Sequence, residues 1–117
     1  MATMNEVVEY VDRIKPNIYT DDDKYRWINT VEGLIGREVL QEDVPAYALP
    51  DDADKQLLVP HPYDDLYRLY VLAMIDQCSG DEGYNNSVLA FEERYKQYRV
   101  WYIRNHDYSK AQFKNLF

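Results

Sequence analysis

Two helix-start signals, each followed by apolar residues at helical spacing, constrain the fold of this chain more than any other feature. Thr3 and Glu6 form a capping-box pattern, in which the threonine hydroxyl accepts a backbone hydrogen bond and the acid reaches back. Thr20 is followed in the same way by three aspartates, whose charges suit the positive end of a helix dipole. The apolar stripes that follow are Val7, Val8, Val11 and Ile14, and then Trp27, Ile28, Val31, Leu34, Ile35 and Val39. These patterns predict amphipathic helices over about residues 4–15 and 21–40.

The second half of the chain predicts two more helices. Pro62 suits the first position of a helix, and Asp64 and Asp65 suit its first turn. The apolar run 69–75 indicates a helix that is buried on nearly all sides, over about 62–79. A stripe with alternating steps of four and three residues predicts a long helix over about 84–105. The stripe consists of Tyr84, Val88, Phe91, Tyr95, Tyr98 and Tyr102, and it is a candidate packing surface or subunit interface.

Residues 41–61 interrupt the helical pattern. Three prolines are spaced along them, and two extended pieces, at 44–49 and 56–59, flank an acidic turn at 51–54. A short β-hairpin or an ordered loop fits this arm. Because an isolated hairpin is only marginally stable in water, we expect the arm to lie on the helices or on a neighbour. Gly33 and Gly36, inside the second helix, could let another backbone pass closely.

The predicted fold class is therefore mainly α, a four-helix domain with a long C-terminal helix. A chain of 117 residues forms one domain, which we expect to span residues 1–105. The basic tail 106–117 is expected to be flexible. No apolar run reaches the ~18–20 residues that cross a bilayer, and the first residues lack the features of a secretory signal. We therefore expect a soluble protein in a reducing compartment.

The charge is unevenly distributed. Residues 1–82 hold 7 Lys and Arg against 18 Asp and Glu, whereas residues 83–117 hold 6 against 3, and the chain's net charge is −8. General nucleic-acid binding is disfavoured, because it needs a basic footprint. Opposite charges can orient subunits head to tail, although plain solubility is the slightly favoured reading. The 12 tyrosines suit either core edges or protein interfaces.

The residues that carry chemistry in other proteins form no convincing catalytic or metal site here. His61 and His106 lack a second ligand at metal-binding spacing. Cys78 lies on the apolar third helix and is expected to be a buried structural thiol, since nearby acids would raise its pKa rather than activate it. The basic run Arg94, Lys96, Arg99 and Arg104 could touch a phosphate backbone, but the polar side of a helix explains it more simply.

Carboxylates are abundant, and we expect them to be solvated at helix starts, turns and polar faces. They are Asp21–Asp23, Asp51, Asp52, Asp54, Asp64, Asp65, Glu92 and Glu93. Asp21, Asp23 and Glu32 also fall at positions 1, 3 and 12 of a calcium-loop pattern. That match fails because Tyr25 replaces an oxygen ligand and Arg26 replaces the turn glycine. We expect no catalytic residue, no cofactor and no bound metal.

The order of four segments resembles the phage head–tail connector or adaptor (head-completion) proteins. The segments are 6–17, 24–33 with its core Trp27-Ile28-Asn29-x-x-Glu32, 57–63, and 84–87 opening the helix that ends at 101–105. The resemblance implies a mostly helical virion protein that does no chemistry. Such proteins assemble as rings, often of twelve copies, beneath the portal, join it to the tail or stopper proteins and line the DNA channel.

The resemblance also implies partners and a location. The partners would be other copies of the chain, the portal protein and tail or stopper proteins, with at most non-specific passage of DNA and no membrane. The protein would be made in the cytoplasm of a bacterial host, from a phage or prophage, and then enter the virion. In the tail, Phe113, Leu116 and Phe117 are candidates for docking to the portal or tail. Two alternatives stay open: a cellular helical adaptor or regulator that dimerises through the 84–102 stripe, and, less favoured, a metal-binding protein or enzyme.

Overall fold

The computed structural model describes residues 2–49, 51–80 and 82–105, and within these ranges the chain is mainly helical, as predicted. The α-helices are α1 (Met4–Ile14), α2 (Asp21–Ile35), α3 (Leu66–Ser79) and α4 (Tyr84–Asn105). A π-helical turn, η1 (Gly36–Leu40), continues α2, and a short 3-10 helix, η2 (Tyr63–Asp65), precedes α3. The predicted tail, 106–117, lies outside the described residues.

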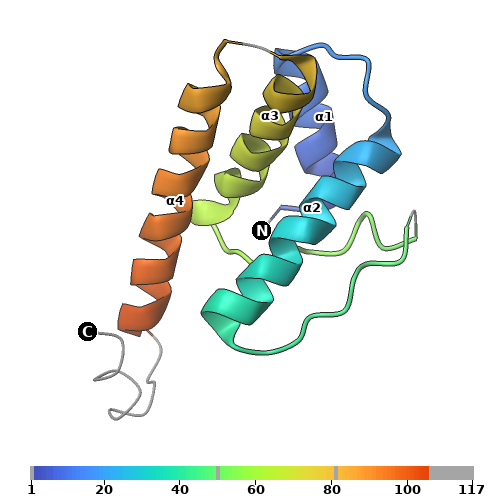
Figure 1. The fold of residues 1–117 in the computed structure, drawn as a ribbon. Coiled ribbons are helices and arrows are strands. Elements are labelled where there is room, and N and C mark those ends of the chain that lie inside the picture. The colour runs from blue at the N-terminus through green and yellow to red at the C-terminus, as the bar shows by residue number, and fades with distance from the viewer. Residues whose placement is uncertain (1, 50, 81, 106–117) are drawn as a thin grey trace.

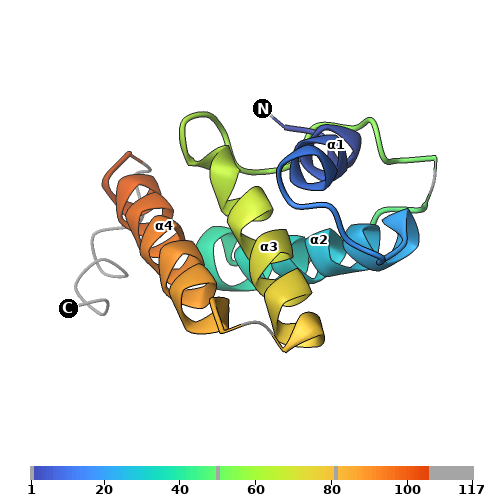
Figure 2. The same cartoon turned by 90° about the horizontal axis from the view of Figure 1, so that it is seen from above.

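Helix α3 is the centre of the domain. It contacts each of the other three α-helices, and α1 and α2 also contact one another. Figures 1 and 2 show α4 on one side of α3 and α1 on the other, while α2 crosses α3 so that its continuation η1 contacts α4. The apolar run of α3 explains this position, since a helix that is apolar on nearly all sides has to be covered on several sides. Val71 is fully buried and Ile75 nearly so.

Most helix ends follow the predicted signals, but α3 begins at Leu66 rather than at the predicted Pro62, and residues 63–65 form the 3-10 helix η2. The hydroxyl of Thr3 accepts from the backbone N–H of Glu6 at 3.2 Å, and that of Thr20 accepts from the N–H of Asp23 at 3.2 Å. The Asp23 carboxylate accepts in return from the N–H of Thr20, which completes a capping box. At the other end of the domain α3 stops at Gly80, whose φ of 67° is a left-handed conformation that glycine adopts without strain.

The arm between η1 and η2 is an ordered loop that packs on the helices. Its described residues contain no strand, and only an isolated antiparallel bridge joins Thr3 to Gln56. The N–H of Leu57 donates to the carbonyl of Ala2 at 2.8 Å. Leu57 and Val59 are buried at 1% and 0% exposure, so the arm supplies part of the hydrophobic core. Of the two predicted forms of the arm, the ordered loop is the one observed.

Gly36 marks the place where this arm leaves the helix. A Cβ added to Gly36 would lie 2.4 Å from Cγ2 of Val44 and 3.1 Å from the carbonyl oxygen of Glu42. The backbone of the arm therefore passes close to Gly36, as the sequence suggested. A Cβ on Gly33 would meet nothing within 4 Å, so the same idea is wrong for that residue.

Candidate interaction surfaces

The aromatic stripe of α4 lies against the rest of the chain. Phe91 and Tyr95 are each 8% exposed and Tyr98 is 1% exposed. The ring of Phe91 stands edge-on to that of Tyr70 in α3, with 5.1 Å between centroids, and Tyr98 packs against Tyr63 of η2 at 6.1 Å. The middle of the stripe is thus internal packing in this structure. A second chain could reach it only if α4 moved away from α3.

The ends of the stripe are less covered. Tyr84, Val88 and Tyr102 are half-buried. Tyr102 also packs near Tyr98, with ring centroids 6.1 Å apart. The remaining predicted site residues, Phe113, Leu116 and Phe117 with His106, lie outside the described part of the chain.

A buried carboxylate, Glu32, fastens the arm to α2. Glu32 is 1% exposed, and it accepts hydrogen bonds from the Tyr67 hydroxyl, from the Tyr47 hydroxyl at 2.9 Å and from the N–H of Leu58 at 3.0 Å. The Tyr67 hydroxyl accepts in turn from the N–H of Val59 at 3.0 Å. Burial raises the pKa of Glu32, and these donors offset part of that rise. Burial next to Glu32 also raises the pKa of Tyr67 far above its ordinary value.

These contacts indicate a structural role for Glu32. All of its partners come from α3 and from the arm, and they hold the arm against the helices. The failed calcium-loop pattern included Glu32, and its neighbours in the structure are donors rather than the oxygen ligands that calcium needs.

Two further buried charges join helices to one another. Lys24 is 2% exposed and donates to Asp12 at 2.5 Å and to the carbonyl of Tyr19 at 3.0 Å. Asp76 of α3 is 3% exposed and accepts from Lys15, beyond the end of α1, and from Ser87 of α4. Charges that are paired in this way can be buried, and breaking one pair leaves the other charge stranded.

The expectation that Cys78 is a buried thiol is wrong. Cys78 is exposed, and so are the residues next to it at the end of α3, Gln77 and Ser79. The expectation that the surface carboxylates are solvated also fails for Asp64, which is 9% exposed and lies against the pocket between α1 and α3. His61 is largely exposed, and its Nδ1 lies 3.7 Å from Oδ1 of Asp64.

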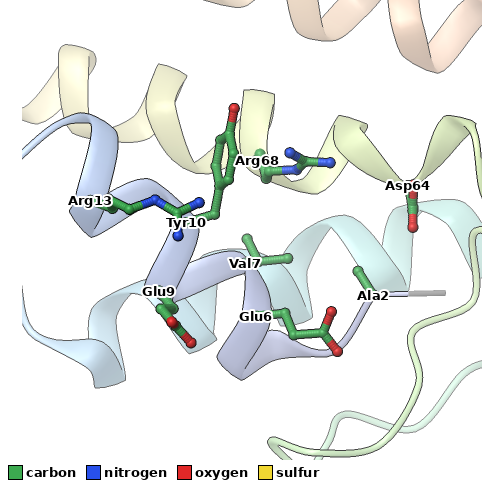
Figure 3. A pocket seen from close by; sticks show the side chains of 8 residues that line it. All are labelled: Ala2, Glu6, Val7, Glu9, Tyr10, Arg13, Asp64 and Arg68. Atoms are coloured by element: carbon green, nitrogen blue, oxygen red, sulfur yellow. The ribbon is translucent and has the colours of Figure 1, made fainter.

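The pocket between α1 and α3 has a volume of about 250 Å³ and mixed charge (Figure 3). Tyr10 lines this pocket, and the guanidinium carbon of Arg13 lies 5.5 Å and that of Arg68 4.3 Å from the centroid of its ring. Glu6 and Glu9 lie on the α1 side of the same pocket. The arrangement is a pair of cation–π contacts that ties α1 to α3. In the described ranges, no group of three or more His, Cys, Asp or Glu side chains could hold a metal ion.

A second hollow, which we call the α4 groove, runs between η2 and the C-terminal half of α4. Its volume is about 520 Å³. Its lining is Pro62, Tyr63, Glu93, Arg94, Lys96, Gln97, Val100, Trp101, Arg104 and Asn105. Cations outnumber acids in this lining, and Val100, at 36% exposure, adds apolar surface. Next to the groove on α4, Leu89 is 61% exposed.

A surface of the opposite character lies where α1 ends and α2 begins, and we call it the acidic end. It consists of Ile14, Ile18, Asp21 and Asp22, all of them exposed. Ile14 is 49% exposed and Ile18 is 92% exposed. Figures 1 and 2 show the start of α2 on the side of the molecule away from α4. The chain thus presents a basic groove and an acidic end, each with apolar residues, on opposite sides of α3.

The sequence alone did not predict the α4 groove or the acidic end as surfaces, although some of the residues of each could be recognised in it. Leu89 and Val100 are eleven residues apart, which places them on one face of a helix, opposite to the buried stripe.

Comparisons of the chain with models of protein families, with curated proteins and with solved structures found no match. None of the described helices is long and apolar enough to cross a membrane.

Proposed function

We propose that this chain is a structural virion protein that joins the portal to the tail, assembling as a ring around the DNA channel. In this proposal the protein acts by packing against other subunits and performs no chemistry. The host cytoplasm is where it is made, and the virion is where it functions. The proposal builds on the resemblance of the four ordered segments to head–tail connector proteins.

One structural observation carries most of the weight. The α4 groove and the acidic end differ in charge and lie on opposite sides of the domain. A protein that dimerises about a twofold axis presents the same patch to its partner, whereas a ring or filament needs two different patches. Two unlike and complementary surfaces therefore favour a head-to-tail assembly over a closed dimer.

The position of the aromatic stripe bears on the rival hypothesis. A cellular adaptor that dimerises through residues 84–102 needs that stripe to be free. Tyr98, near its centre, is 1% exposed and packs on Tyr63 of the same chain.

The net charge of −8 favours passage of DNA without tight binding, because like charges repel.

Native mass spectrometry of the full chain tests this proposal, alone and mixed with the portal protein encoded in the same genome. We expect either a closed ring of many copies or a monomer that assembles on the portal. A tight dimer that never grows and ignores the portal would contradict the proposal and support the adaptor. A genome without a portal gene near this one would contradict it as well.

A further inference from the structure

The α4 groove carries two cations that no acid in the described part of the chain neutralises. Lys96 and Arg104 are exposed and form no ion pair within residues 2–49, 51–80 and 82–105. Arg94, on the same helix, differs because its Nε lies 2.9 Å from Oδ1 of Asp65. Trp101 is half-buried in the groove wall, next to Val100. The groove therefore suits an acidic segment that also carries an apolar side chain.

The acidic end has this composition. Asp21 and Asp22 occupy the first turn of α2, and their carboxylates are exposed. Ile18 lies three residues before Asp21 and is 92% exposed, an unusually complete exposure for a large apolar side chain. Asp23 is different, because its carboxylate accepts from the N–H of Thr20. Two acids and an exposed isoleucine are thus free to contact another molecule.

We propose that the acidic end of a second copy occupies the α4 groove. This inference rests on the proposed function, since it names the surfaces through which the ring would form. The acidic end of the same copy cannot be the occupant, because α2 begins on the far side of the domain from α4. Residues 106–117 match the groove poorly in charge, since Lys110 and Lys114 outnumber Asp107. A second copy supplies both the negative charge and the apolar side chain.

This contact makes every copy both a donor and an acceptor. The groove of one copy takes the acidic end of the next, whose own groove is free for a third. Such a heterologous contact closes into a ring when the rotation between copies divides a full turn, and otherwise it forms a filament. Because the contact is charged and near the surface, high salt weakens it: the screening length falls from ~10 Å at 0.1 M to ~3 Å at 1 M.

Charge reversal with rescue tests the pairing. The groove variant is Lys96→Glu with Arg104→Glu, and the acidic-end variant is Asp21→Lys with Asp22→Lys. The combined variant carries all four changes in one chain. Sedimentation velocity over a range of concentrations, in 0.05 M and 1 M salt, measures assembly, and far-ultraviolet circular dichroism checks the fold. If the lysines unfold the start of α2, the variant Asp21→Asn with Asp22→Asn is used in place of the lysine variant. It removes the two negative charges and is also expected to weaken assembly.

We expect each double variant to need about tenfold or more higher concentration than the wild type to assemble, because like charges would face each other. The combined variant should recover, since it restores opposite charges in exchanged positions. The control variant Arg37→Glu with Lys55→Glu makes the same change of net charge as the groove variant, at residues that line neither surface. It should assemble as the wild type does.

Five outcomes would overturn the pairing. A groove variant that assembles like the wild type, or a folded combined variant that does not recover, would show that other surfaces meet. Either result leaves the proposed function standing. A wild type that stays monomeric at every concentration in low salt would remove the second copy as the occupant, and binding to the portal would then decide the proposed function separately. Stronger assembly on deletion of residues 106–117, or loss of DNA binding in the groove variant without loss of assembly, would assign the groove to the tail or to nucleic acid.

Discussion

Replacing Glu32 should destabilise the domain more than the loss of one ordinary surface charge, because Glu32 holds the arm in place. Glu32→Ala removes the acceptor for the Tyr67 hydroxyl, which is buried, and for the N–H of Leu58, which is half-buried. A stranded buried donor costs ~1–3 kcal/mol, and a half-buried donor costs less because water can reach it, so the two together cost about 3 kcal/mol. Tyr47 adds little, since its half-buried hydroxyl can turn to water.

That loss is a large part of the ~5–15 kcal/mol that stabilises a typical domain. Urea denaturation at pH 7 and constant protein concentration measures it directly. Hydrogen exchange locates it, because the N–H groups of Leu58 and Val59 should lose protection before those of α3. Glu32→Gln keeps one carbonyl acceptor and should cost only ~1–2 kcal/mol. A loss below ~1 kcal/mol for Glu32→Ala would refute the view that this carboxylate anchors the arm.

The same residue gives a prediction about pH. Burial raises the pKa of Glu32 above its ordinary value of 4.5, so the folded protein holds that proton more tightly than the unfolded chain. The stability that this tighter proton binding adds is therefore fully present below pH 4.5, and it is lost as the pH rises through the higher pKa of Glu32 in the folded state. Glu32→Gln cannot ionise. The stability of the wild type relative to Glu32→Gln should fall between pH 4 and pH 8, and a constant or rising difference would contradict the assignment.

The remaining predictions concern packing and exposure. Tyr98→Ala should cost ~3–5 kcal/mol in urea denaturation, because a large buried aromatic is removed; a cost under ~1 kcal/mol would mean that α4 is not fixed against η2. Gly36→Ala should destabilise the domain while Gly33→Ala stabilises it slightly, because only the first Cβ meets Val44; equal effects in thermal melts would contradict the observed path of the arm. Cys78 should react with a thiol reagent in the folded state as fast as in urea, and strong protection would contradict its exposure.

The helices were predictable because their signals are local. The two threonine caps, the apolar stripes and the terminating Gly80 depend on residues close together in sequence, and the observed helices begin and end near the predicted residues. Whether the arm forms a hairpin or an ordered loop depends instead on contacts between residues far apart in the sequence. It depends on where Leu57 and Val59 find a core to enter, and that core is built by α1, α2 and α3.

The buried charges were missed for a different reason. Lys24 and Glu32 lie at helical spacing from Ile28 and Ile35, so they stand on the buried face of α2. Charged residues at such positions are buried only when partners are present, and the partners Asp12, Tyr47 and Tyr67 come from other elements. The helical spacing was visible in the sequence, but the partners were visible only in three dimensions.

The candidate surfaces, too, could be predicted only in part from the sequence. The sequence pointed to α4 through its aromatic stripe, which faces inward, whereas the α4 groove uses the other side of the helix together with η2. The uneven charge of the chain predicts surfaces that could orient subunits, and both this role and the pairing of the two surfaces stay proposals.

Electron microscopy of the full chain mixed with the portal protein of the same genome tests the central claim most directly, namely that this protein works by packing head to tail with other subunits. The account predicts an added ring of density on the portal, in which the α4 groove of each copy faces the start of α2 in the next. A portal that stays bare, or a twofold dimer that binds through the α4 stripe, would contradict it.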